Sequence, residues 1–287
     1  MKPRIVFFGT PDFVVPIVQN LFDTFELVGI VTAPDSLDSH KKILTPSPVK
    51  KFATDHSLPI FTFEQFNNQT IKQLSSLNPD LFVVAAYGRI IPLKIINLPP
   101  HGSLNVHPSL LPKYRGTSPI QNALINGDSL TGVSIIKMDE KMDHGPILSQ
   151  WEKPIAPTDT YATLHHLLFK DAAEKLPDII SEYIDGKLTP KEQNEAEATY
   201  CQKIKKEDGY FTTDSPPSPE VLDRMIRAYY PWPTAWTKVK IRDSEEKIVK
   251  LYPEGKIQME GKNIVTVKEF LNGYPELKQL LERLLPQ

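Results

Sequence analysis

The sequence predicts a doubly wound, mainly parallel α/β sheet followed by a smaller C-terminal β-barrel domain of the oligonucleotide-binding type. Two observations support this fold class. Short apolar runs of strand length alternate with segments of helical spacing up to about residue 184, which is typical of parallel sheets covered by helices. Between residues 208 and 287, several short strand-like segments are separated by turns, which favours a small barrel.

The elements of the first part follow in a regular order. Strands are expected at residues 4–9, 27–32, 59–63, 80–86, 102–107, 133–138 and 147–151. Helices are expected at residues 13–21, 47–57, up to 77, 119–126 and 161–184. In the last of these helices, apolar residues such as Leu164, Leu168 and Ala172 share one face. The helices are therefore predicted to bury one side against the sheet.

We divide the chain into a catalytic domain at 1–188, a linker at 189–207 and an abbreviated C-terminal barrel domain at 208–287. The linker is polar and has no sustained apolar period. The C-terminal domain is predicted to contain a helix at 219–229, strands at 235–241, 247–252, 256–259 and 264–267, and a final helix at 275–285.

The composition is that of a soluble globular protein. The chain has 287 residues, 40% hydrophobic and 24% charged, and a formal net charge of −2, which gives no general affinity for nucleic acid. A single cysteine excludes an internal disulfide framework. The first strand begins without a signal peptide, and no segment reaches the length of a membrane span. We therefore expect a cytoplasmic protein, without metal or membrane contact, that acts as a monomer.

The strand at 102–107 ends in a cluster of polar residues. Side chains alternate along a strand, so Asn105 and His107 lie on the same face at its exit. Asp143 follows the next long strand and can meet His107 at the carboxyl edge of one sheet, the usual ligand position in open α/β folds. An amide, an imidazole and a carboxylate can together polarise a carbonyl, stabilise an oxyanion and move a proton. A lone histidine here could instead be purely structural.

Two loops are candidate binding elements. Pro108 and Pro112 end the strand and are expected to leave Ser109, Leu110 and Leu111 as an exposed apolar corner, suited to form the wall of a site for a flat ligand. The polar loop at 33–46 contains Lys41 and Lys42, which fit a solvated loop tip as well as a binding role. Gly9 alone does not make a dinucleotide-binding fingerprint, so no nucleotide cofactor is indicated.

The pattern formed by Asn105, His107, residues 109–112, Asp143 and Gly145 resembles that of the folate-dependent formyltransferase family, whose catalytic domain is Rossmann-like. Further matching stretches point to the tRNA-directed branch of that family. They are residues 8–13, 46–50, 115–121, 205–209, 227–233 and 268–273. The resemblance thus covers nearly the whole chain.

The resemblance implies a reaction and a role for each matching residue. A formyl group would pass from 10-formyltetrahydrofolate to the free amino group of initiator methionyl-tRNA. Asn105 and His107 would stabilise the oxyanion, and Asp143 would hold His107 and a water and assist proton transfer. The remaining implied contacts are Ser109, Leu110, Leu111 and Pro112 along the folate, Arg89, Ile90 and Ile91 against its pteridine, and Phe13 against the methionyl side chain.

The loop after the second strand departs from the family pattern. Residues 38–40 stand where the family has an arginine flanked by glycines, so Lys41 and Lys42 remain as its basic part, with a role at the tRNA acceptor end. Two alternatives stay open. An N-formyltransferase acting on a nucleotide-linked amino sugar would use the same Asn105, His107 and Asp143, and a non-catalytic folate- or RNA-binding protein would need none of them for turnover.

Overall fold

The computed structural model describes residues 1–37, 44–241 and 246–285. Lys41 and Lys42 lie outside these ranges. The chain forms two compact units: the first consists of Met1–Arg115, Gly132–Lys153 and His166–Tyr200, and the second of Gly116–Thr131, Pro154–His165 and Cys201–Gln287. The segment predicted as a linker, 189–207, is therefore divided between the units, and two earlier segments group with the C-terminal residues.

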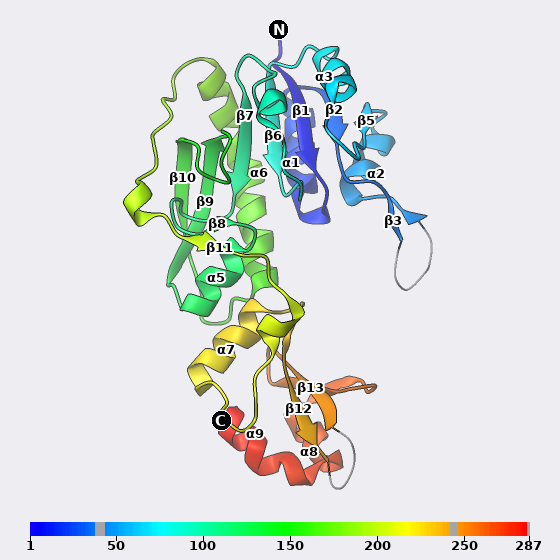
Figure 1. The fold of residues 1–287 in the computed structure, drawn as a ribbon, viewed down its shortest axis with the longest axis vertical. Helices are drawn as coiled ribbons and strands as arrows, with labels where there is room; N and C mark the ends of the chain where they lie inside the picture. Colours follow the sequence, from blue (N-terminus) through cyan, green and yellow to red (C-terminus); the bar gives the residue numbers. More distant parts are fainter. Residues whose placement is uncertain (38–43, 242–245, 286–287) are drawn as a thin grey trace. The chain divides into compact units, whose positions relative to one another are not determined.

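The first unit is built on a seven-stranded sheet within the described residues, with the order β10-β9-β7-β6-β1-β2-β5 (Figure 1). Its strands are β1 (Arg4–Gly9), β2 (Glu26–Val31), β5 (Ile60–Phe61), β6 (Leu81–Ala85), β7 (Ser103–His107), β9 (Leu130–Lys137) and β10 (Ile147–Pro154). Strands β7, β6, β1, β2 and β5 pair in parallel, whereas β9 runs antiparallel to β7. The predicted mainly parallel sheet is thus confirmed.

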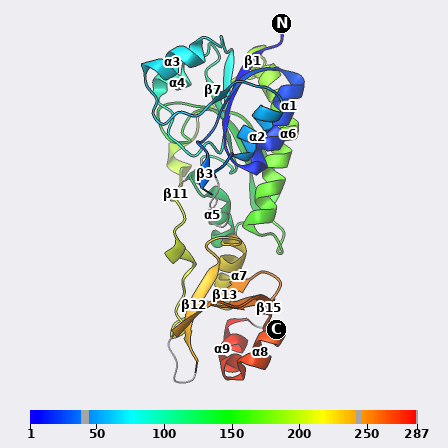
Figure 2. The same cartoon turned by 90° about the vertical axis from the view of Figure 1, so that its right-hand side faces the viewer.

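Helices cover both faces of this sheet. They are α1 (Val15–Thr24), α2 (Pro48–Asp55), α3 (Asn68–Ser75), α4 (Leu93–Ile96) and α6 (Tyr161–Ile184). Figure 2 shows α1, α2 and α6 on one face and α3 and α4 on the other. Alternate residues of β1 face opposite sides, and Val6 and Phe8 pack into the cluster that contains Leu74 of α3 and Ile95 of α4. After Arg4 the strand contains only apolar residues and glycine, because both of its faces are buried.

The starts of helices α2 and α3 follow from local sequence chemistry. Ser47 accepts a hydrogen bond from the Lys50 N–H at 3.0 Å, and Pro48 occupies the first turn of α2, where a missing N–H costs nothing. Asn67 caps α3 in the same way and forms a capping box with Thr70.

Register brings three strand ends to one edge of the sheet. Gly9 at the end of β1 pairs with Ala85 at the end of β6, and Val84 of β6 pairs with Asn105 of β7. Residues that follow these three strands therefore leave the sheet at the same edge, which is where ligands bind in open α/β folds.

The second unit contains a four-stranded antiparallel sheet within the described residues, in the order β12-β13-β14-β15. Its elements are α5 (Pro119–Asn126), η3 (Lys206–Gly209), α7 (Pro219–Ala228), β12 (Ala235–Lys240), β13 (Glu246–Tyr252), β14 (Lys256–Met259), β15 (Ile264–Thr266), α8 (Val267–Gly273), η4 (Pro275–Leu277) and α9 (Lys278–Leu284). Apolar residues of the sheet, α7 and α9 share one core, including Leu222, Val249 and Leu281.

Closure of this sheet into a barrel stays a prediction. In the described residues the sheet is a meander with β12 at one end and β15 at the other, and Tyr210 adds an isolated parallel bridge to Trp236. The remaining short elements are η1 (Asp12–Val14), β3 (Ser36–Leu37), β4 (Leu44–Thr45), β8 (Arg115–Gly116), η2 (Glu195–Glu197) and β11 (Tyr200–Cys201).

Candidate active site

Three polar side chains converge at the carboxyl edge of the sheet in the first unit. Asn105 and His107 lie at the end of β7, and Asp143 lies in the loop between β9 and β10. The Nδ2 of Asn105 donates to Oδ1 of Asp143 at 3.1 Å, and the Nδ1 of His107 lies 3.5 Å from Oδ2 of the same carboxyl. The structure thus brings the three predicted side chains together. The expected route for Asp143 was wrong, because β9 is antiparallel to β7 and the carboxylate comes from the loop after β9 rather than from a parallel strand end.

The trio is largely withdrawn from solvent. The side chain of His107 is 4% exposed and that of Asp143 is 11% exposed. In such surroundings, hydrogen bonds and charge interactions are electrostatically stronger than in water. An amide, an imidazole and a carboxylate placed here can therefore act strongly on a polar ligand.

The backbone fixes the proton on one nitrogen of His107. The Nε2 of His107 lies 2.9 Å from the carbonyl oxygen of Tyr114. A carbonyl can only accept, so Nε2 carries its hydrogen and donates it. The nitrogen that can gain or lose a proton is therefore Nδ1, which faces Asp143.

The loop that carries Asp143 has a demanding backbone. Asp143 has φ of 51°, in the left-handed region. At Gly145, an added Cβ would lie 1.9 Å from the carbonyl oxygen of Lys137, so only glycine fits there. The spacing of Asp143 and Gly145 in the sequence motif thus has a physical cause: the carboxylate is presented by a turn that passes directly over the end of β9.

Two residues beside the trio were not predicted as site residues. The Nε2 of Gln193 donates to the carbonyl oxygens of Asp143 and Gly145, both at 2.8 Å. Arg115 is fully buried and donates to Gln193 and Glu195. The hydrogen bond from Arg115 lowers the pKa of Glu195, and Glu195 in turn raises the pKa of Arg115. Arg115 begins one of the stretches that match the family pattern, 115–121, whereas Gln193 lies in a polar segment without any period.

The segment 109–112 corrects one expectation. Ser109 is 1% exposed and donates through its Oγ to the carbonyl oxygen of Lys113 at 2.7 Å, and Leu111 is also buried. Leu110 is half-buried and packs against Gly132. The expected exposed apolar corner was therefore wrong: two of its three side chains point inward, in a loop whose polar groups bond both within the loop and to Ser134 of β9. Pro112 follows a cis peptide bond and is half-buried.

The segment after β6 presents one apolar side chain to solvent. Ile90 is 83% exposed, whereas Ile91 is buried. Arg89 is exposed and is anchored by hydrogen bonds to the carbonyl oxygens of Phe63 and Glu64. Burying the exposed face of Ile90 under a ligand would be favourable, so this residue suits a contact with an apolar or aromatic group.

Phe13 lies in η1, which follows the end of β1 at the same edge of the sheet. Its ring is half-buried and its centroid lies 4.8 Å from that of Phe169 in α6. Nearby, the Oγ1 of Thr10 donates to the carbonyl oxygen of Tyr87 at 3.4 Å, and burial raises the pKa of the Tyr87 hydroxyl. Phe13 therefore stands on a packed support rather than on a free loop.

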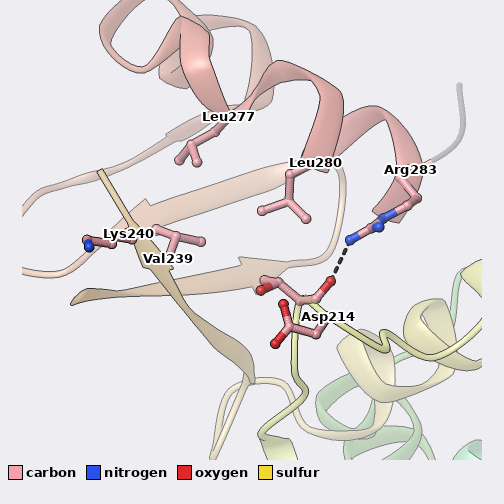
Figure 3. Close-up of a pocket in the computed structure, with 7 residues that line it drawn as sticks. Asp214, Val239, Lys240, Leu277, Leu280 and Arg283 are labelled. Atoms are coloured by element: carbon pink, nitrogen blue, oxygen red, sulfur yellow. Dashed lines mark hydrogen bonds between the residues drawn. The ribbon is translucent and has the colours of Figure 1, made fainter. Parts of the chain in front are cut away.

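A separate pocket lies in the second unit, between β12, the segment near Asp214 and the C-terminal helices (Figure 3). Val239, Leu277 and Leu280 form its apolar side, and Arg283 donates to the carbonyl oxygen of Thr213 across its rim. None of the predicted catalytic residues lines it.

Over residues 1–37, 44–241 and 246–285, no cluster of three metal-ligating side chains occurs. Over the same ranges, no helix has the length and apolarity to cross a membrane.

Comparisons with known proteins identify a family for this chain. The pattern of the family described as Formyl transferase matches residues 3–180. The methionyl-tRNA formyltransferase of Bacillus licheniformis is 42% identical over 236 residues, which are 82% of this chain and 74% of that protein. The methionyl-tRNA formyltransferase of Thermodesulfovibrio yellowstonii is 38% identical over 302 aligned positions, covering 95% of this chain and 96% of that protein.

Solved structures share the fold. A methionyl-tRNA formyltransferase from Clostridium thermocellum superposes with a TM-score of 0.59 at 20% identity, over 92% of this chain and 99% of that one. A 4-N formyltransferase from Francisella tularensis gives a TM-score of 0.67 at 19% identity, over 88% of this chain and 98% of that one. At these identities the likeness describes the fold and does not distinguish between acceptors.

Proposed function

This chain belongs to the formyl transferase family, and we propose that it transfers a formyl group to the free amino group of initiator methionyl-tRNA, a step of translation initiation. The relatives that support this acceptor are about 40% identical over most of the chain, and one of them matches almost end to end, including the C-terminal residues. The observation that carries the chemistry is the convergence of Asn105, His107 and Asp143 at one edge of the sheet.

Formyl transfer requires stabilisation of one transient charge. When the amine attacks the formyl carbon, the formyl oxygen becomes negative. In our proposal the amide of Asn105, which donates one of its two hydrogens to Asp143, offers the other to this oxygen. His107 acts through Nδ1, because its Nε2–H is committed to Tyr114. A protonated Nδ1 adds a second donor and a positive charge.

The reaction also moves one proton from the attacking amine to the nitrogen that leaves. An α-amino group has a reference pKa of about 7.7–8.0, so its reactive neutral form is accessible near neutral pH. In our proposal Asp143, which faces both Asn105 and His107, holds His107 and a water and assists this transfer.

We propose 10-formyltetrahydrofolate as the formyl donor. It would lie along residues 109–112, with its pteridine against residues 89–91. Because Ser109 and Leu111 are turned inward, the first segment would offer mainly its backbone and the partly exposed Leu110 and Pro112. The exposed side chain of Ile90 supports the second contact, because an aromatic ring would bury it.

Two further contacts to the acceptor are proposed. Phe13 would contact the methionyl side chain, and its packing on Phe169 would hold its ring in place. Lys41 and Lys42 would contact the phosphates of the acceptor end of the tRNA. Since this acceptor is made and used in the cytoplasm, we place the protein there. That it acts as a monomer stays a prediction.

A comparison of two acceptors tests the proposed function. The purified protein is incubated with formyl-labelled 10-formyltetrahydrofolate and either methionyl-tRNA or a nucleotide-linked amino sugar, and the label in each acceptor is followed with time. Methionyl-tRNA whose amino group has been acetylated is the control, because it keeps the RNA and removes the nucleophile. We expect label only in unblocked methionyl-tRNA. Label only in the amino sugar would show that the acceptor is the amino sugar and not the tRNA. No label in either acceptor would favour a non-catalytic binding protein.

A further inference from the structure

We propose that Gln193 is a positioning residue that holds the Asp143 loop in its reactive geometry, and that Arg115 in turn holds Gln193. This inference rests on the proposed function, since it concerns the same site. Gln193 comes from the polar segment that the sequence marks as a linker, yet it donates hydrogen bonds directly to the backbone that carries the predicted catalytic carboxylate.

The first step is the pair of bonds from Gln193 to the loop. Its Nε2 donates to the carbonyl oxygens of Asp143 and Gly145, each at 2.8 Å. A side-chain amide has two N–H donors, so both are used on this loop. The two carbonyls flank His144. Gln193 therefore clamps both ends of the turn, which has φ of 51° at Asp143.

The second step is the support of Gln193 itself. Its Oε1 accepts from Nε of Arg115 at 3.0 Å and from Nη2 at 2.8 Å. The other guanidinium hydrogens go to the two carboxylate oxygens of Glu195, at 2.5 and 3.1 Å, and to the hydroxyl of Tyr200 at 3.0 Å. All five N–H donors of the arginine thus have an acceptor. A fully buried cation is tolerated only when its donors are paired in this way. Because Oε1 of Gln193 accepts two of these donors, the side-chain amide of Gln193 is held in one orientation.

The third step connects the same segment to His107. The N–H of Arg115 donates to the carbonyl oxygen of Thr199 at 2.9 Å, and the N–H of Tyr114 donates to Oγ1 of Thr199 at 2.8 Å. The carbonyl of Tyr114 is the group that accepts from Nε2 of His107. Residues 193–200 therefore support Asp143 on one side through Gln193 and His107 on the other through the backbone at Tyr114.

The consequence is a specific kinetic effect. Gln193 contacts the backbone of the loop, so its removal would shift the carboxylate of Asp143 without removing any group that we propose to contact the folate or the tRNA. A displacement of about 1 Å at a reacting group can cost about 10²-fold in rate. We expect kcat to fall by about 10- to 100-fold, with the KM for either substrate changing by less than about threefold.

Three variants distinguish positioning of the Asp143 loop by Gln193 from a role that only attaches the segment 193–200 to the first unit. Gln193→Met keeps the length of the side chain and removes all its hydrogen bonds. Gln193→Glu keeps an acceptor for Arg115 but removes both donors to the loop. Asn194→Ala is the matched control: it removes the cap of η2 and a bond to Glu197, in the same segment, without a contact to the Asp143 loop. For each variant, kcat, both KM values and thermal unfolding by circular dichroism are measured.

The proposal expects both Gln193 variants to fold and to lose kcat at nearly unchanged KM, while Asn194→Ala stays within about twofold of wild type. It is overturned if Gln193→Glu keeps wild-type kcat, if KM rises instead of kcat falling, if the control loses as much, or if the Gln193 variants do not fold. If the wild-type protein itself does not formylate methionyl-tRNA, the proposed function fails first. Wild-type turnover with unaffected Gln193 variants rejects the positioning role alone.

Discussion

The Nδ1 atom of His107 lies 3.5 Å from Oδ2 of Asp143, although His107 ends β7 and Asp143 lies in the loop after β9. Because Nε2 of the same ring donates to the carbonyl of Tyr114, Nδ1 is the ring nitrogen left to face Asp143 and a ligand. Asn105 reaches the other oxygen of the carboxylate. The account of catalysis depends on these contacts, and each prediction below tests one part of it.

Asn105→Ala removes the amide that we propose to face the developing oxyanion. Loss of one such donor typically costs about 10²–10³ in turnover, and we expect a fall in kcat of this size in a steady-state formylation assay. Ser103→Ala on the same strand is the control. Its Oγ donates to the carbonyl of Ile96 at 2.7 Å, so its loss should cost about 1 kcal/mol of unfolding free energy and leave kcat unchanged. Equal losses of kcat would contradict the proposed role of Asn105.

Gly145→Ala places a Cβ where the carbonyl oxygen of Lys137 already lies, at 1.9 Å. The backbone must move, so we expect a loss of about 2 kcal/mol or more in unfolding free energy, together with a lower kcat because Asp143 shifts. Gly273→Ala is the matched control, since its added Cβ meets nothing within 4 Å. Urea unfolding of both variants checks this, and similar midpoints would show that the loop tolerates the change.

We expect the ionised carboxylate of Glu195 to contribute to the unfolding free energy in a pH-dependent way. The hydrogen bond from Arg115 is the main cause that lowers its pKa, and the charges of Arg115, His144 and Lys141 act in the same direction. A lowered folded-state pKa means that the stabilisation is fully present above the unfolded pKa, about 4.3, and is lost as the pH falls through the folded value. Glu195→Gln should therefore have a lower urea midpoint than wild type at pH 7, and the difference should shrink below about pH 4.3. A difference independent of pH would show that the charge is not responsible.

Ile90→Ser tests the proposed contact with the folate ring. Ile90 is 83% exposed in the structure, so the change should alter unfolding free energy by no more than about 0.5 kcal/mol. If a ring covers it, the lost contact of about 1.4 kcal/mol raises the KM for the formyl donor about tenfold. Ile264→Ser, at a 48% exposed position in the second unit, should leave that KM unchanged. A KM equal to wild type in Ile90→Ser would place the folate elsewhere.

Much of the site was predictable because its signals are local. Alternation along β7 places Asn105 and His107 on one side. Asp143 was expected at the carboxyl end of a neighbouring parallel strand, but β9 is antiparallel to β7, and the carboxylate reaches the pair through the loop between β9 and β10. The role of Gln193 was not predictable in the same way, because its bonds reach across the sequence from a polar segment without a period. The inward turn of Ser109 also depends on a non-sequential partner, Ser134, whose Oγ donates to its carbonyl.

The elements of the fold likewise divide into those that local sequence patterns predict and those that depend on tertiary packing. The strand at β1 and the helices α5 and α6 have the predicted bounds, because each carries a complete apolar pattern with clear ends. The short helices α4 and α8 were missed, since a helix of one or two turns is stabilised by packing more than by its own sequence. The grouping of residues 116–131 with the C-terminal residues likewise depends on tertiary packing, which the polarity of residues 189–207 does not reveal.

The most direct test of the catalytic trio is the kcat for formylation of methionyl-tRNA by His107→Ala, compared with wild type at saturating concentrations of both substrates. Circular dichroism first establishes that the variant is folded. The account predicts a loss of about 10²–10³-fold, because the variant lacks the Nδ1 group beside Asp143. A folded variant that formylates methionyl-tRNA at the wild-type rate would contradict it and leave His107 as a structural residue of β7.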